Sequence, residues 1–83
     1  MDIYQSARKH GITDDDITHA VQQAVVAADE PGPQSALLGP DRAGNMLEVV
    51  TVVRKNGTEI VIHAMRMRRI YEPLLRETGE DRG

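Results

Sequence analysis

The dipeptide Asn56-Gly57, between two apolar segments, constrains this chain more than any other feature. Asn-Gly is the strongest short signal for a β-hairpin, because both residues tolerate the positive φ angles of a tight turn. The segments at 45–55 and 58–64 are rich in β-branched side chains at strand spacing. The chain is therefore expected to contain a long antiparallel hairpin.

A two-residue turn at this dipeptide also predicts the strand register. It places Lys55 opposite Thr58 and Val50 opposite His63. Because opposed side chains share a face, one face is expected to be the core and the other to be mixed. The predicted core face holds Leu47, Val49, Thr51, Val53, Ile60, Ile62 and Ala64, and the mixed face holds Glu48, Val50, Val52, Arg54, Glu59, Val61 and His63.

Helical patterns precede and follow the strands. Thr13 is the expected N-cap of the second helix, Gly11 the left-handed residue before it, and Pro73 kinks the last helix or starts a new turn. The expected helices span residues 2–10, 13–28 and 66–77, and the expected strands span residues 35–38, 45–55 and 58–64. We expect an α+β fold with N-terminal helices, a three-stranded antiparallel β-meander and a C-terminal helix. It forms a single domain over residues 1–83 whose tail, 78–83, is frayed.

The composition restricts the classes of function. A net charge of −3 argues against a surface that binds nucleic acid everywhere, and a chain without cysteine has no disulfide or thiolate metal site. Neither a secretory signal nor an apolar segment of about 20 residues, the length of a membrane helix, is found. Asp15 and His19 stand one helical turn apart without a third ligand, so an ion pair is favoured over a metal site, and no cofactor is expected.

Cationic side chains gather where the hairpin leads into the last predicted helix. His63 is followed by Arg66, Arg68 and Arg69, and the predicted register places Glu48 diagonally next to His63. A histidine oriented by a carboxylate, with arginines beside it, suits proton transfer at a phosphate. The ordinary alternatives are a strand-end histidine with one backbone hydrogen bond, and arginines paired with a glutamate on the helix surface.

Other charged positions have simple explanations. Lys9 and His10 precede a helix-ending glycine, where the helix dipole favours cations. Arg54 opposite Glu59 is most simply a cross-strand ion pair.

Several short stretches resemble the RelE-like toxins, and among these the BrnT-type toxins. They are Lys9-His-Gly-Ile12, the strand Ile60-Val-Ile-His-Ala64, and Met65-Arg66-Met67-Arg68-Arg69 after it. The stretches Leu-Leu-Gly-Pro-Asp-Arg and Ile-His-Ala-Met are similar to short actinobacterial toxin proteins. The resemblance implies a RelE-like fold and a cytoplasmic endoribonuclease, the toxin of a type II toxin–antitoxin pair, which acts as a homo-oligomer or in a hetero-oligomer with its cognate antitoxin.

The resemblance also implies a metal-independent attack of a ribose 2′-hydroxyl of RNA on the adjacent phosphate. In such a site His63 or Glu48 moves protons, and Arg66 stabilises the charge on phosphorus. The further candidates for contacts with the RNA are Arg68, Arg69, Lys9 and Arg54.

A non-catalytic function is the alternative. Val50, Val52 and Val61 form a small apolar patch on the mixed face, and this patch with the arginine-rich helix suits a protein-binding module. The two hypotheses differ in one geometric requirement, because the nuclease needs His63, Glu48 and Arg66 to converge on one solvent-facing point.

Overall fold

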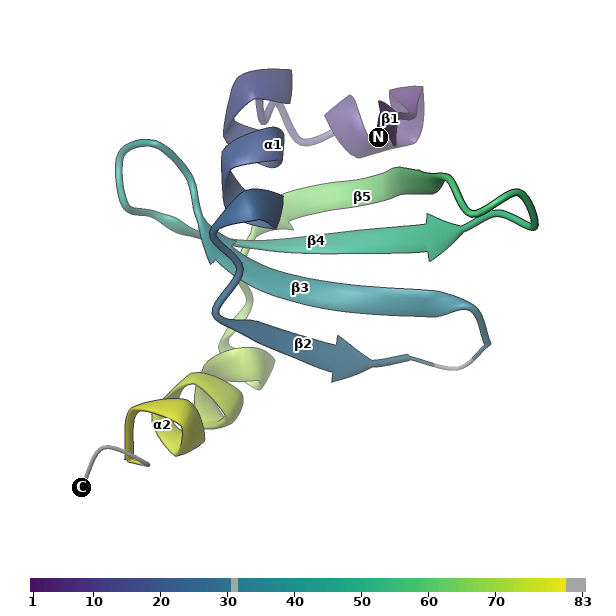
Figure 1. Cartoon of the computed structure of the whole chain (residues 1–83). Coiled ribbons are helices and arrows are strands. Elements are labelled where there is room, and N and C mark those ends of the chain that lie inside the picture. Colours follow the sequence, from purple (N-terminus) through teal and green to yellow (C-terminus); the bar gives the residue numbers. More distant parts are fainter. Residues whose placement is uncertain (31, 81–83) are drawn as a thin grey trace.

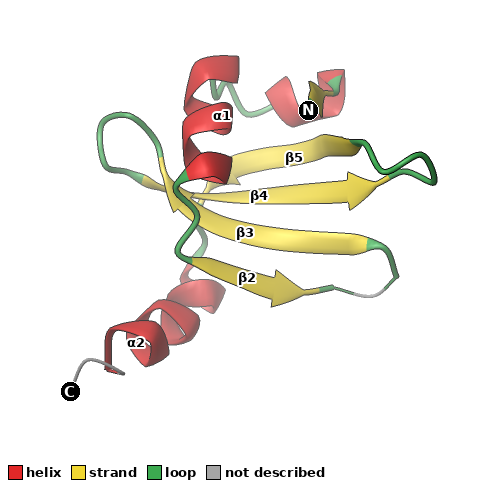
Figure 2. Ribbon diagram, in the orientation of Figure 1, coloured by secondary structure: helices red, strands yellow, loops and turns green. Residues whose placement is uncertain are grey.

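The computed structural model describes residues 1–30 and 32–80, and its centre is one five-stranded mixed sheet (Figure 1). The strand order is β1-β5-β4-β3-β2, with β1 parallel to β5 and all other neighbours antiparallel. The strands are β1 (Asp2–Ile3), β2 (Val26–Asp29), β3 (Gln34–Pro40), β4 (Met46–Val53) and β5 (Glu59–Arg66). The helical elements are the 3-10 turns η1 (Gln5–Arg8) and η2 (Arg69–Tyr71) and the helices α1 (Asp14–Gln22) and α2 (Glu72–Glu80) (Figure 2).

The predicted three-stranded meander with N-terminal helices is wrong. The segment predicted as a first helix forms β1 and the single turn η1, and the second helix ends at Gln22 instead of residue 28. The backbone N–H of Val25 donates to the carbonyl of Leu38 at 2.8 Å and opens the β2–β3 ladder. A longer helix would leave β3 as an unpaired edge, so sheet pairing overrides the helical pattern of the alanines. Pro31 lies outside the described residues.

Helix α1 begins and packs as its sequence indicates. The Thr13 hydroxyl accepts a hydrogen bond from the N–H of Asp16 at 3.2 Å, which confirms the predicted N-cap. The helix packs across β3 and β4. It approaches β3 closely at Gly39, where a Cβ atom would lie 2.1 Å from the carbonyl oxygen of Ala20.

The turn of the β4–β5 hairpin has three residues, not the predicted two. The N–H of Arg54 donates to the carbonyl of Thr58, and the N–H of Gly57 donates to the carbonyl of Arg54, each at 2.8 Å. Gly57 has a φ of +88°, so the loop is a type I turn closed by a left-handed glycine. This turn shifts the register of the adjacent pairs by one residue from the predicted one.

A β-bulge in β5 reverses that shift. Thr51 pairs with Val61, yet its neighbour Val50 pairs with His63, so Ile62 is the extra residue. From the bulge to the end of β5 the predicted register is correct. Between the loop and the bulge it is wrong.

Because of the three-residue loop, the predicted faces are wrong between the loop and the bulge. Val61, predicted on the mixed face, is fully buried in the core, and Ile60 takes its place opposite Val52. Val53, predicted in the core, is 54% exposed. The core lies between the sheet and the α1–η1 layer and consists of Ala7, Ile17, Ala20, Leu47, Val49, Val61 and Ala64.

The chain after β5 is not the predicted helix from residue 66. Arg66 still belongs to β5, Arg68 is extended (φ −82°, ψ 155°), and a helix begins only at Glu72. Pro73 is the second residue of α2, so it starts a new helix and does not kink an old one. Residues 78–80 belong to α2, and the rest of the predicted frayed tail, 81–83, lies outside the described residues.

Candidate functional site

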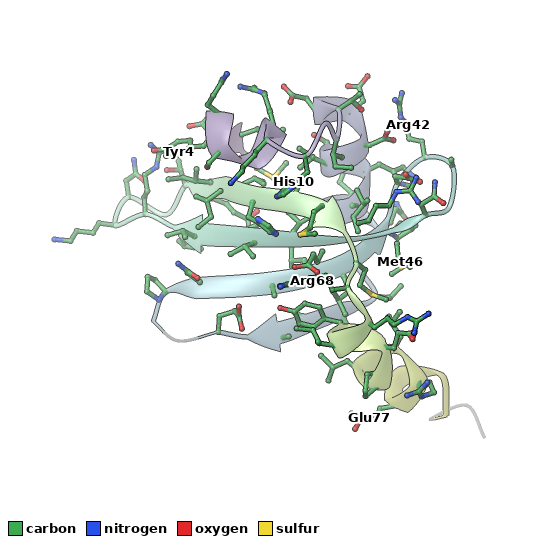
Figure 3. All side chains as sticks on the ribbon, turned by 180° about the vertical axis from the view of Figure 1, so that it is seen from behind. Tyr4, His10, Arg42, Met46, Arg68 and Glu77 are labelled. Atoms are coloured by element: carbon green, nitrogen blue, oxygen red, sulfur yellow. The ribbon has the colours of Figure 1, made fainter. Side chains whose placement is uncertain are left out.

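The sheet face opposite α1 carries a buried carboxylate held by an arginine. Glu48, in the middle of the sheet, is 1% exposed. Arg68 donates to it from Nε at 3.0 and 3.2 Å and from Nη2 at 2.9 Å, and the backbone N–H of Arg68 adds a bond of 3.0 Å. Figure 3 shows Arg68 lying over this face of the sheet. The backbone at Arg68 is extended, so both its N–H and its side chain reach Glu48 before η2 begins.

The pair keeps Glu48 ionised. Burial raises the pKa of the Glu48 carboxyl, but the hydrogen bonds from the side chain and backbone of Arg68 and the charges of Arg68 and His63 outweigh it. The resulting pKa lies below the ordinary value of 4.5. The same contacts raise the pKa of Arg68. A buried, ionised and fully bonded carboxylate is suited to orient a neighbour, not to exchange protons with a substrate.

One histidine lies next to this carboxylate, and a second histidine contacts the first. The Nε2 atom of His63 lies 3.5 Å from Oε2 of Glu48, and the side chain of His63 is 31% exposed. The ring of His10 meets the ring of His63 edge to face, with centroids 5.5 Å apart and an angle of 77° between the ring planes. His10 is exposed and comes from the turn after η1. The site therefore presents two imidazoles to solvent, one of them backed by a carboxylate.

The structure brings together two members of the predicted triad. Glu48 and His63 are in contact as the register indicated, but Arg66 pairs with Leu47 across β4 and β5 and so lies on the opposite face. Arg66, His63 and Glu48 do not converge, so the triad that the nuclease hypothesis required is not formed. Arg68 takes the place that the sequence assigned to Arg66, because the chain remains extended for two residues beyond β5.

The predicted RNA-contacting residues are dispersed. Arg54 lies six residues along β4 from Glu48, about 20 Å at strand spacing, and it bonds Asp2 at 2.7 Å instead of the predicted Glu59. Lys9 is exposed next to His10, and Arg69 is exposed in η2. Lys9 and Arg69 thus each adjoin a site residue in the sequence, whereas Arg54 belongs to the far end of the sheet.

His10 is the site residue that sequence reasoning missed. Its position before Gly11 was attributed to a helix dipole, but η1 is a single 3-10 turn without a helix dipole of useful length. The contact between His10 and His63 joins residues 53 positions apart, so only the pairing of β1 and η1 with β5 reveals it. The local sequence carries no signal for it.

Other predicted pairs are replaced. His19 bonds the carbonyl of Pro40 at 2.8 Å, and Asp15 lies 3.6 Å from Arg42, so Asp15 and His19 do not form the predicted ion pair. Within the described part of the chain, no three His, Cys, Asp or Glu side chains form a group that could hold a metal ion.

The apolar patch proposed for protein binding is reduced. Val50 and Val52 are half-buried on the face of Glu48, but Val61 is fully buried on the other face. No helix among the described residues is long and apolar enough to span a membrane.

The chain belongs to the DUF4258 family, a domain of unknown function, whose model matches residues 3–66. The matched region contains His10, Glu48 and His63, whereas Arg68 and α2 lie beyond it. No curated protein and no solved structure is significantly similar to the chain.

Proposed function

We propose that this protein is an endoribonuclease that cleaves RNA without a metal, by attack of a ribose 2′-hydroxyl on the adjacent phosphate. The observation that carries the proposal is the contact between the exposed imidazole of His10 and the partly exposed imidazole of His63, which lies beside the buried Glu48. The reaction needs one group to take the proton of the 2′-hydroxyl and another to protonate the 5′-oxygen that leaves. Two imidazoles in contact can serve the two oxygens, since the bond from the 2′-oxygen forms and the bond to the 5′-oxygen breaks at the same phosphorus.

Glu48 has a supporting part in this mechanism. A carboxylate 3.5 Å from Nε2 orients the ring of His63 and offsets the positive charge that the ring acquires when it takes up a proton. Arg68 holds the carboxylate in place, and its half-exposed guanidinium adds positive charge at the edge of the site. Lys9, next to His10, is a further cation for the RNA backbone.

The biological setting is part of the same proposal. The resemblance to BrnT-type toxins supports a toxin of a type II toxin–antitoxin pair, which acts on RNA in the cytoplasm and is silenced by a cognate antitoxin. Expression in bacteria should then arrest growth, and co-expression of a neighbouring gene product should relieve the arrest. Growth at the uninduced rate, with intact cellular RNA, would contradict the toxin assignment.

The chemistry is tested with purified protein and end-labelled single-stranded RNA in the presence of EDTA. We expect cleavage to products that end in a 2′,3′-cyclic phosphate, and no cleavage of the 2′-deoxy analogue. His63→Ala and His10→Ala should each lower the rate by about 10²–10⁴-fold.

The matched control is the third histidine of the chain. His19, on α1, bonds the carbonyl of Pro40 at the end of β3 and lies outside the site. His19→Ala should therefore retain the wild-type rate after correction for the folded fraction. Equal rates for His63→Ala and the wild type would identify a contaminating nuclease and remove the proposal.

A further inference from the structure

The β-bulge at Ile62 decides which way His63 points. The three-residue loop sets pairs such as Thr51 with Val61, and a regular ladder continued from there would place His63 opposite Val49. Val49 is a core residue, so His63 would then face α1 and not Glu48. The extra residue moves His63 opposite Val50 and thereby onto the face that carries the site.

A serine side chain from another element binds the bulge. The Ser6 hydroxyl donates to the carbonyl of Ile62 at 2.7 Å. The adjacent carbonyl, that of Val61, accepts the N–H of Tyr4 at 2.9 Å. Next to Ser6, Ala7 is fully buried in the core and holds η1 against the sheet.

The Ser6–Ile62 bond therefore connects the two segments that carry the imidazoles. On β5 it lies one residue before His63, and on η1 it lies four residues before His10. The β1–β5 ladder, the Tyr4–Val61 bond and the buried Ala7 also hold these segments together. Of these hydrogen bonds, the Ser6–Ile62 bond lies nearest in sequence to both imidazoles, so it restrains both rings most directly.

We infer that Ser6 is a positioning residue, whose hydroxyl holds the bulge of β5 and η1 together so that His10 and His63 stay in ring contact. This inference rests on the proposed function for its catalytic consequence, but not for its structural one. One hydrogen bond changes the population of the ordered arrangement by about three- to tenfold. Loss of this hydrogen bond should therefore lower kcat and leave KM unchanged, because substrate binding by the exposed cations is unaffected.

The experiment compares Ser6→Ala with Ser6→Thr and Ser6→Val. The last two side chains have nearly the same shape, but threonine has a hydroxyl where valine has a methyl group. In the wild type we expect NMR cross-peaks between the ring protons of His10 and His63. Ser6→Ala and Ser6→Val should weaken these cross-peaks, move the ring shifts of both histidines and lower kcat about three- to tenfold with KM unchanged. Ser6→Thr, which keeps the hydroxyl, should retain the wild-type cross-peaks, ring shifts and kcat.

The control is Gln5→Ala, which removes a neighbouring side-chain bond to Arg8 of 3.3 Å without touching β5. It should leave the cross-peaks as in the wild type. Unchanged cross-peaks and shifts in Ser6→Ala overturn the inference, and so does loss of the fold, because Ser6 would then be a general structural residue. If the wild-type protein cleaves no RNA, the proposed function fails, while the ring contact still tests Ser6.

Discussion

Replacement of Arg68 by alanine should destabilise this protein more than the same replacement of Arg42, Arg54, Arg66 or Arg69. Glu48 is 1% exposed and keeps, in the variant, only the backbone N–H of residue 68 at 3.0 Å and the imidazole of His63 at 3.5 Å. Removal of one partner of a fully buried ion pair costs about 3–5 kcal/mol. The side chain of Arg68 is 53% exposed, so water can replace part of the lost contact. We therefore expect a loss of about 2–3 kcal/mol.

The assay is urea and thermal unfolding followed by far-ultraviolet circular dichroism. In a domain of this size, a loss of about 2–3 kcal/mol corresponds to a fall in Tm of roughly 10–20 °C. Arg66→Ala is the control, since Arg66 is exposed on the opposite face and pairs with no carboxylate within residues 1–30 and 32–80. It should change the free energy of unfolding by less than about 0.5 kcal/mol.

Two further variants separate the ion pair from simple packing. Glu48→Met combined with Arg68→Ala removes the charge that Arg68→Ala leaves buried, so the double variant should be more stable than Arg68→Ala. The difference in free energy of unfolding between Arg68→Ala and the wild type should also shrink as the pH falls below about 4.5, the ordinary pKa of a glutamate carboxyl. Arg68 lowers the pKa of Glu48, so its contribution is present above that value and disappears as Glu48 takes up a proton. An Arg68→Ala variant within about 0.5 kcal/mol of Arg66→Ala at neutral pH would refute the reasoning.

Two other predictions concern elements away from the site. Gly39→Ala should cost about 3 kcal/mol in urea unfolding, because its Cβ would lie 2.1 Å from the backbone oxygen of Ala20. Gly57 has open space around it but a φ of +88°, so Gly57→Ala should cost about 1–2 kcal/mol. A larger loss of stability for Gly57→Ala than for Gly39→Ala would contradict the close approach of α1 and β3. The side-chain and backbone hydrogen bonds of Arg42 lower the pKa of Asp16 to about 2, so this contact should stabilise the fold above pH 3.8 and be lost as the pH falls towards 2. Unfolding midpoints of the wild type and Arg42→Ala between pH 5 and 2 should therefore converge, and a constant gap would show that Asp16 is not responsible.

Local patterns predicted several elements correctly. The Asn-Gly signal predicts the hairpin and Thr13 is a correctly predicted N-cap. The contact between Glu48 and His63 is also predicted, but only because the bulge cancels the shift that the three-residue loop introduces. These features depend on turn chemistry and on the two-residue period of a strand, both of which are local.

The errors have a common physical cause. Residues 26–29 are alanine-rich and continue a helical pattern. They form a strand because they pair with the edge of β3, which would otherwise be unpaired. Residues 2–3 are too short to predict as a strand and form one only because β5 offers an edge. Pairing between distant segments supplies hydrogen bonds that no local window contains, and it decides between conformations of similar intrinsic propensity.

The sequence by itself determined that an acidic chain contains a hairpin with a carboxylate on one strand and a histidine on the other, followed by arginines. Only the tertiary structure decided which arginine and which second histidine join them. Arg68 reaches Glu48 because the chain stays extended after β5, and His10 reaches His63 because β1 and η1 dock on the far edge of the sheet. A bulge then sets the face of His63, since one extra residue reverses the direction of every side chain beyond it.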